Sequence, residues 1–460
     1  MSAARNDDDS HGPGRRDTSR PSRRQLLLGA SGAALAVSSG AASAQGNWFD
    51  TIFNQGSGGA RAATSEDGRR KPEALNDLRP DSTPWRSDTM LDAIEGAIQR
   101  YQKIADAGGW PVVPGSRMIR PEDDDERIPV LRRRLVASGE LSRNGLSQSF
   151  TFDGELELAV RRFQENQGLR TSGRVDKPTL AALNVPVQTR LAQLRLNAGR
   201  IRELMGPRVE DRYILVNVPA FQLEAVERHE VQQRHRVIAG RPERQSPYVR
   251  ANIRAVNFFP YWRVPDSVAT LDIIPRMRKE PDYIIKERIR VVRGNFNGPE
   301  IDPTSIDWNT ATSVDLKFRQ DPGPHNALGL MRIDMPNSEG VYMHDTPMKQ
   351  LFTQRMRAFS AGCVRVQDVD KLVEWIVRYE AGWEQPGRAM SVVEGGQALD
   401  VTLTRQVPVY FAYITAWAEP GDGRAVFRPD IYGRDGLRES TAGRERDESE
   451  GPAPAHTLAP

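Results

Sequence analysis

The spacing of apolar residues changes once along this chain, near residue 210, and this change limits the possible folds more than any other feature. Before it, apolar residues recur every three or four positions in segments 90–104 and 187–205, as in amphipathic helices. After Tyr213, apolar and polar residues alternate in several short runs, which predicts strands joined by short turns. We therefore expect a multidomain α+β protein whose second half is a mainly antiparallel sheet.

The first 44 residues read as an export signal. The pair Arg23-Arg24 precedes a weakly apolar run, and small residues ending at Ala44 suit cleavage there, as in twin-arginine signal peptides. An uncleaved anchor is the alternative, but the run is shorter than the ~20 residues that a spanning helix needs. We expect a protein exported to the periplasm of a Gram-negative bacterium, with no transmembrane segment after signal cleavage.

Composition and helical periodicity set further boundaries. Residues 45–84 are rich in Gly, Ser, Pro and charge and predict a flexible linker, and residues 437–460 predict a disordered tail. Segments 85–127 and 186–210 predict a helical scaffold, with Ser87 as the N-cap of its first helix.

A more specific motif lies between the scaffold helices, in residues 128–185. It reads FQ-x-x-x-G-L-x-x-x-G-x-x-D-x-x-T-x-x-A-L-N from Phe163 to Asn184. Gly168 suits the end of one helix and Asp176 the N-cap of the next. The segment resembles the small three-helix peptidoglycan-binding module. The alternative is a structural helical hairpin that binds nothing.

Residues 211–436 contain the predicted strands, interrupted by an insertion at 262–312. Pro265, Pro275 and other prolines divide this insertion into segments that we read as short helical pieces. An insertion of this length in a β-domain favours a lid over the site, and its aromatic and basic residues could contact an anionic ligand. A stabilising subdomain remote from the site is the alternative.

The chain has one cysteine, Cys363, in the sequence Ser360-Ala361-Gly362-Cys363-Val364-Arg365. A lone thiol forms no internal disulfide, and in an exported protein it points to reactivity. The glycine allows a ligand to approach the backbone, and the guanidinium of Arg365 favours a thiolate. These features predict a nucleophile.

A nucleophilic cysteine needs a base, because an ordinary thiol pKa of ~8.5 leaves little thiolate near neutrality. Of the six histidines, His344 ends an apolar strand 19 residues before Cys363 and is the predicted base. The others lie in terminal segments, on predicted solvated strand positions or, as a weak second choice, in a turn: His11, His456, His229, His235 and His325.

The phrases around His344 and Cys363 closely resemble the catalytic motif of L,D-transpeptidases, the YkuD-type domain. The resemblance covers about residues 86–435, and the module and insertion make the chain similar to the large periplasmic members of YcbB type. It implies that Cys363 attacks the third residue of a donor tetrapeptide stem and expels D-alanine. The amine of another stem's third residue then takes the acyl group, which makes a 3→3 crosslink.

The resemblance also implies supporting roles. N–H groups around Gly362 and Cys363 would bind the oxyanion, while Ser360 would hold the loop by hydrogen bonds. Arg365 would either lower the thiol pKa or brace the loop. Many family members have histidine at the position of Ala361, so Tyr342 or the insertion would have to supply any substrate contact made by that side chain.

Other function classes find little support. Lys and Arg total 64 against 61 acidic residues, with no basic block suited to nucleic acid. No His/Cys spacing predicts a metal site, and we expect no cofactor and a monomer. Similarity to the family makes the chain a candidate carbapenem target. Two alternatives stay open: an L,D-carboxypeptidase or endopeptidase that uses water, and a non-catalytic wall-binding scaffold.

Overall fold

The computed structural model describes residue 75 and residues 77–437. The predicted signal peptide, most of the predicted linker and the tail after Leu437 lie outside these residues. Within the described part of the chain, no helix is both long enough and apolar enough to span a membrane.

The two scaffold helices, α2 (Asp88–Asp106) and α6 (Val187–Met205), pack against each other. Ser87 caps α2 by accepting the Met90 N–H at 3.2 Å, which confirms the predicted N-cap. The helices share one apolar core with one side of the strand region and with the hairpin of β14 (Ala416–Ala418) and β15 (Ala425–Phe427), through residues that include Met90, Ile94, Leu194, Ile201, Tyr213 and Trp417.

The motif-bearing segment forms a helical module with its own core. Its elements are α3 (Ile128–Ser138), the turn η1 (Arg143–Gly145), α4 (Gly154–Asn166) and α5 (Lys177–Leu183).

Hydrogen bonds explain the motif of this module. The buried Gln164 amide donates to Thr179 Oγ1 at 3.0 Å and accepts the Gly173 N–H at 2.9 Å. Asp176 caps α5 by accepting the Thr179 N–H, as predicted. Much of the motif therefore encodes the fold of the module rather than a ligand contact.

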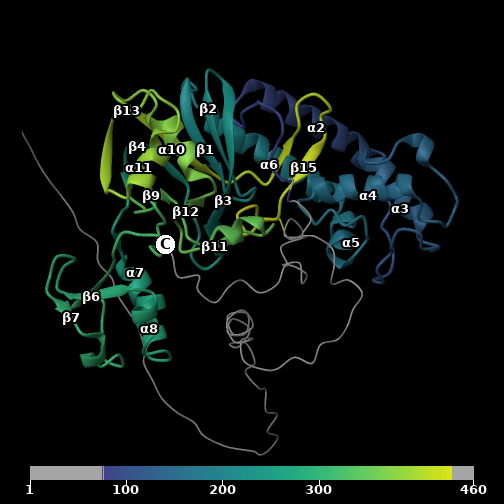
Figure 1. Cartoon of the computed structure of the whole chain (residues 1–460). Coiled ribbons are helices and arrows are strands. Elements are labelled where there is room, and N and C mark those ends of the chain that lie inside the picture. Colours follow the sequence, from purple (N-terminus) through teal and green to yellow (C-terminus); the bar gives the residue numbers. More distant parts are fainter. Residues whose placement is uncertain (1–74, 76, 438–460) are drawn as a thin grey trace, which may run out of the picture. The chain divides into compact units, whose positions relative to one another are not determined.

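The strand region is a nine-stranded sheet in the order β11-β3-β12-β10-β9-β4-β13-β1-β2 (Figure 1). Its strands are β1 (Arg212–Asn217), β2 (Gln222–Glu227), β3 (Glu230–Gly240), β4 (Val249–Phe258), β9 (Met331–Asp334), β10 (Met343–His344), β11 (Ala358–Ser360), β12 (Val364–Val366) and β13 (Leu399–Ala412). An additional pairing of β2 with β3 closes this order into a ring, to which β11 is appended. The predicted antiparallel character holds for most pairs, but β1–β13, β10–β12 and β3–β11 are parallel.

Apolar side chains of these strands form a second core, covered by α10 (Val369–Val377) and, beside it, α11 (Arg388–Gly395). The short helix η4 (Lys349–Thr353) packs against β3 and lies in the connection from β10 to β11. This connection runs from β10, which carries the predicted base His344, to β11, which leads to the predicted nucleophile Cys363.

The insertion differs from the prediction in content and in length. It holds a four-stranded sheet, β5-β8-β6-β7, as well as helices, and the last strand of this sheet ends beyond the predicted limit at 312. The β-branched residues Ile289, Val291 and Val292 were the missed strand signal, since prolines on either side suggested helical pieces. Its elements are β5 (Trp262–Arg263), α7 (Asp266–Val268), the π-helical turn η2 (Ala269–Ile273), α8 (Ile274–Met277), α9 (Tyr283–Lys286), β6 (Ile289–Arg293), β7 (Glu300–Ile301), η3 (Pro303–Ser305) and β8 (Leu316–Gln320).

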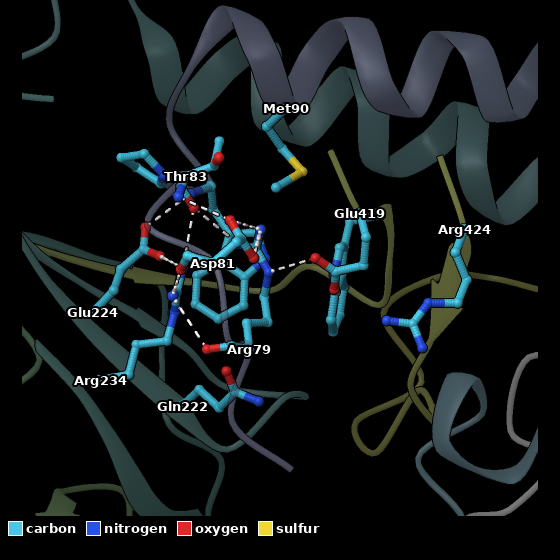
Figure 2. Close-up of polar contacts among 12 residues, drawn as sticks. Arg79, Asp81, Thr83, Met90, Gln222, Glu224, Arg234, Glu419 and Arg424 are labelled. Carbon is cyan, nitrogen blue, oxygen red and sulfur yellow. Dashed lines mark hydrogen bonds and ion pairs between the residues drawn. The ribbon is translucent and has the colours of Figure 1, made fainter. Parts of the chain in front are cut away.

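Residues 77–85, here called the strap, correct the predicted linker boundary at 84. Asp77 pairs with Arg236 at 2.7 Å and with Arg357 at 2.6 Å. The strap also carries the nearly buried Arg79, which contacts Glu419 at 3.2 Å (Figure 2). A composition typical of linkers hid these pairs, because each partner lies more than 150 residues away in the sequence.

Candidate active site

The pairing of β10 with β12 brings the predicted base and nucleophile together. His344 lies opposite Arg365 in this parallel pair, and the Val364 N–H donates to Tyr342 O at 3.0 Å, which sets Cys363 beside Tyr342. Alternate residues of a strand point to opposite faces, so these four side chains share one face of the sheet. His344 is thus a diagonal cross-strand neighbour of Cys363, a relation that places Cα atoms ~7–8 Å apart and lets long side chains meet.

His344 is fully buried, and its ring is held from one side. Nδ1 lies 2.5 Å from the carbonyl oxygen of Asp345. A carbonyl only accepts hydrogen bonds, so Nδ1 carries the proton and Nε2 is the nitrogen that can take one. The Tyr342 ring meets the imidazole edge-on, with centroids 5.7 Å apart. The backbone carbonyl of Asp345 therefore orients the imidazole so that Nε2 can act as a general base.

The carboxylate of Asp345 is occupied elsewhere. It accepts the Leu330 N–H at 3.0 Å and forms an ion pair with Lys349. Gly329, with φ +62°, leaves room for it, because a Cβ there would lie 2.4 Å from Asp345 Cγ. The group that orients His344 is the backbone carbonyl of Asp345, not its side chain.

The thiol of Cys363 is 6% exposed, and burial raises its pKa to about 11. Hydrogen bonds from Tyr342 and the positive charges of Arg332 and Arg365 oppose this rise without overcoming it. Arg365 favours the thiolate, as expected, but burial outweighs this effect. The thiol is neutral at rest and must lose its proton to a base before it can attack.

Arg365 is fully buried beside this thiol. Burial lowers its pKa to about 10, with the charge of Cys363 acting in the opposite direction, so the guanidinium remains a cation near neutrality. The charge of Arg365 lowers the pKa of Cys363, as the electrostatic alternative requires, and bracing of the loop stays the other alternative.

The loop before Cys363 is held by hydroxyl groups. Ser360 Oγ donates to Cys363 O at 2.5 Å and accepts the Gly362 N–H at 3.1 Å, as expected for a residue that braces the loop. Gly362 has φ +124°, a conformation that favours glycine. Because its N–H is engaged, Gly362 is not the oxyanion donor that we expected in this state. Among the described residues, the Cys363 N–H donates to no acceptor and is the remaining candidate.

Sequence reasoning missed the outer support of this loop. Ser246 Oγ donates to Gly362 O at 2.8 Å and accepts the Gly240 N–H at 2.9 Å. The hydroxyl of Tyr432 donates to Gly240 O at 2.6 Å and accepts the Ser246 N–H at 3.1 Å. No local motif marks Ser246, because two of its partners, Gly362 and Tyr432, lie more than 100 residues further along the chain.

The insertion lies against the site. Two residues close to Cys363 pack on the apolar core of the insertion. Ala361 lies two positions before Cys363 in the sequence, and Tyr342 lies beside it on the neighbouring strand segment. Asp272 of the insertion forms ion pairs with Arg241, at 2.8 Å, and with Arg244. Among its basic residues, Arg278 donates to Trp308 O at 2.8 Å and is thus engaged within the insertion.

The remaining histidines occupy other environments. His235 is buried, with Nδ1 at 2.8 Å from Gln367 O, instead of on the solvated strand position that we predicted. His229 and the second-choice base, His325, are exposed. Within the described residues, no three His, Cys, Asp or Glu side chains gather as a metal ion would require.

Two segments of this chain match known protein families. Residues 211–398 match the model described as "L,D-transpeptidase catalytic domain" (YkuD), and residues 124–183 match "Putative peptidoglycan binding domain". A protein of Haemophilus influenzae named "Putative L,D-transpeptidase" is 34% identical over 247 residues, which are 53% of this chain and 48% of that protein. The chain therefore spans about half the length of this relative.

Two solved L,D-transpeptidases were also compared. The one from Xylanimonas cellulosilytica is 12% identical, with 65% of this chain and 98% of that chain covered and a TM-score of 0.20. The one from Stackebrandtia nassauensis is 13% identical, with 64% and 96% covered and a TM-score of 0.23. Scores this low do not establish a shared fold. The similarity depends on the sequence matches: residues 211–398 are similar to the L,D-transpeptidase catalytic domain of YkuD type, and residues 124–183 are similar to the peptidoglycan-binding domain.

Proposed function

We propose that this protein is a cysteine acyltransferase that joins peptidoglycan stem peptides through 3→3 crosslinks. The observation that carries the proposal is the shared sheet face of Cys363 and His344, with the imidazole oriented so that Nε2 can accept a proton.

In the first half-reaction, the thiol proton passes to His344 as sulfur attacks the carbonyl carbon of the donor's third residue. A neutral resting thiol with a pKa of about 11 suits this order, since it becomes nucleophilic only when a base takes its proton. The imidazolium then returns the proton to the leaving amine, and the bond to D-alanine breaks. The product is a thioester on Cys363.

In the second half-reaction, the side-chain amine of an acceptor stem attacks this thioester. His344 takes the proton that the amine loses and passes it back to the sulfur as the thiolate leaves. In both steps the Cys363 N–H would donate a hydrogen bond to the oxyanion that forms on the carbonyl oxygen. An amide between two third residues results, and the enzyme regains its starting state.

The covered site favours an amine acceptor over water. Cys363 and His344 are buried under an insertion whose core contacts Ala361 and Tyr342, so bulk water has little access to a thioester there. We propose that the insertion opens to admit the stems and then closes. Hydrolysis, the carboxypeptidase or endopeptidase alternative, would dominate if closure failed.

Incubation of purified protein with disaccharide-tetrapeptides tests the reaction. Mass spectrometry should show crosslinked dimers and free D-alanine in equal amounts, and a short-lived adduct on Cys363. Stems shortened by one residue without dimers would instead identify a carboxypeptidase. If neither an adduct nor a product formed, the non-catalytic wall-binding scaffold would be the remaining alternative.

The paired arginine at 23–24 supports a further part of the proposal, export to the periplasm by the twin-arginine route. The signal segment fused to a reporter should be cleaved and exported in a bacterium with that pathway. Arg23→Lys together with Arg24→Lys should abolish export, and export of this double variant at the normal rate would disprove the route.

A further inference from the structure

A cavity of about 440 Å³ lies apart from the catalytic residues, where the helical module meets the rest of the described chain. Five stretches supply its walls: strap residues 77–80, module residues between 158 and 179, residues 219–221, residues 355–356, and residues between 417 and 429. Neither Cys363 nor His344 lines it. Its volume suits a small ligand or a short peptide fragment.

The charge of this cavity is predominantly positive. Seven arginines and four acidic residues line it. Three of the acids are held by groups of the protein: Asp77 by two arginines, Asp176 by the Thr179 N–H, and Glu419 by Arg79 and by Trp417 Nε1 at 2.8 Å. Three of the arginines pair with carboxylates that do not line the cavity: Arg79 with Asp81, Arg161 with Glu157 and Arg424 with Asp422. Arg428 and Arg162 are therefore the lining cations that we consider for an anionic occupant.

Arg428 is the clearest such cation. Its Nη1 donates to two backbone carbonyls, Phe427 O at 2.8 Å and Asn166 O at 3.4 Å, and its guanidinium lies 5.0 Å from the centre of the Trp417 ring. Among the described residues, no carboxylate forms an ion pair with it. Burial lowers its pKa to about 10, so it stays charged near neutrality. The charges of Asp77 and Glu419 raise the pKa of Arg428 but neither carboxylate forms an ion pair with it, so a ligand carboxylate could pair with its guanidinium directly.

The module motif admits this arginine. Gly168 has φ +66°, and a Cβ at that position would lie 2.9 Å from Arg428 Cδ. The glycine thus ends α4 and also lets Arg428 approach the module. A second cation, Arg162, stands exposed on α4 with Nε donating to Glu140 O at 2.9 Å. These two arginines come from the two sides of the junction.

We propose that this cavity binds a carboxylate-bearing stem peptide of peptidoglycan through Arg428 and Arg162. The identity of the ligand rests on the proposed function. The site that binds it is built from the helical module together with other parts of the chain, not from the module alone. Met356 and other apolar lining residues would contact the peptide backbone and side chains. Met356 precedes Ser360 by four residues, so the bound stem touches the segment that leads to Cys363.

Calorimetric titration of the full chain with a soluble disaccharide-tetrapeptide tests the site. Arg428→Gln should weaken binding about tenfold, the effect of losing one charge-assisted hydrogen bond. Arg162→Gln, at an exposed position, should weaken it about twofold. Arg133→Gln is the matched control, because Arg133 is exposed on α3 of the same module and does not line the cavity. Arg428→Lys should restore part of the affinity.

Two further arms separate this site from the catalytic one. The first repeats the titrations after Cys363 has been acylated with a carbapenem: stem binding should persist and stay sensitive to Arg428→Gln. Titration of the Cys363→Ala variant gives the same comparison if acylation fails, so loss of the proposed function does not hide the result. The second uses a tetrapeptide with amidated carboxylates, which should bind the parent protein as weakly as the intact ligand binds the Arg428→Gln variant.

Equal binding by the Arg428→Gln and Arg133→Gln variants overturns the proposal. If Arg428→Gln does not fold, as judged by thermal unfolding, Arg162→Gln and the amidated ligand decide. Unchanged affinity in both of these arms also overturns it.

Discussion

The thiol of Cys363 and the carboxyl of Glu224 are both buried acids next to arginines, in separate parts of the same ring of strands. Burial raises the pKa of Cys363 to about 11 and that of Glu224 to about 7, and in each case nearby guanidinium groups oppose the rise. The difference lies in the other neighbours.

Beside Cys363 stands an imidazole that can accept a proton. The Glu224 carboxylate accepts the Trp85 N–H at 2.9 Å, which ties the strap to β2, and it pairs with Arg234 of β3 at 3.5 Å. Arg234 in turn donates to the strap carbonyl groups of Arg79 and Thr83 (Figure 2). An arginine does not accept a proton in this pH range. Burial therefore raises the pKa of the acid in both clusters. The cluster around Cys363 contains an imidazole that can accept the proton, whereas the cluster around Glu224 holds the strap in place.

Cys363→Ala should have the largest effect, complete loss of acylation. Incubation with a carbapenem, which resembles an acyl donor, should add one drug mass to the parent protein and none to the variant. Fold should be unchanged by circular dichroism. An undiminished adduct on the variant would mean that the nucleophile lies elsewhere.

His344→Ala should slow acylation by about 10²–10⁴-fold, the usual contribution of a general base. Because the thiol pKa is about 11, raising the pH should recover the rate by about tenfold per unit up to that value. Stopped-flow acylation rates between pH 6 and pH 10 measure this. His325→Ala is the matched control, and if it is the slow variant, the base has been misassigned.

Arg79→Gln should break the strap cluster without touching the reaction. It leaves the largely buried Glu419 without its arginine, a change that typically costs about 3–5 kcal/mol when a buried pair loses one member. Urea unfolding measures the loss. Arg254→Gln is the control, because Arg254 is 60% exposed in its pair with Asp334 and should cost little. Slower acylation per folded Arg79→Gln molecule would contradict the separation of the two clusters.

Glu224 predicts a smaller, pH-dependent effect. Its folded pKa of about 7 lies above its ordinary value of 4.5, so between these values the folded state holds a proton that the unfolded state has lost. Stability should therefore fall as pH rises through this window, by at most about 1.4 kcal/mol per unit, and level off above it. Glu224→Gln should remove this slope. Urea titrations at several pH values would count against the assignment if both proteins kept the same slope.

Local patterns predicted much of the fold. Helical spacing and short-range caps suffice for α2, where Ser87 bonds three residues away, and for α5, where Asp176 does the same. The reactive pair was also accessible, since a lone cysteine and six histidines allow elimination. The sheet within the insertion was missed because its strands are short and lie among prolines, so local and pairing signals conflict.

The sequence by itself determined the properties that depend on a few neighbouring residues. These are the type of each element, the helix caps, the motif around Cys363 and the choice of its histidine partner. Tertiary structure alone decided which charges meet. Asp77 pairs with Arg357 across 280 residues, Ser246 supports Gly362 across 116, and the walls of the junction cavity come from five separate stretches. It also decided the thiol pKa, because burial is a property of packing and here outweighs the adjacent arginine that the sequence displays.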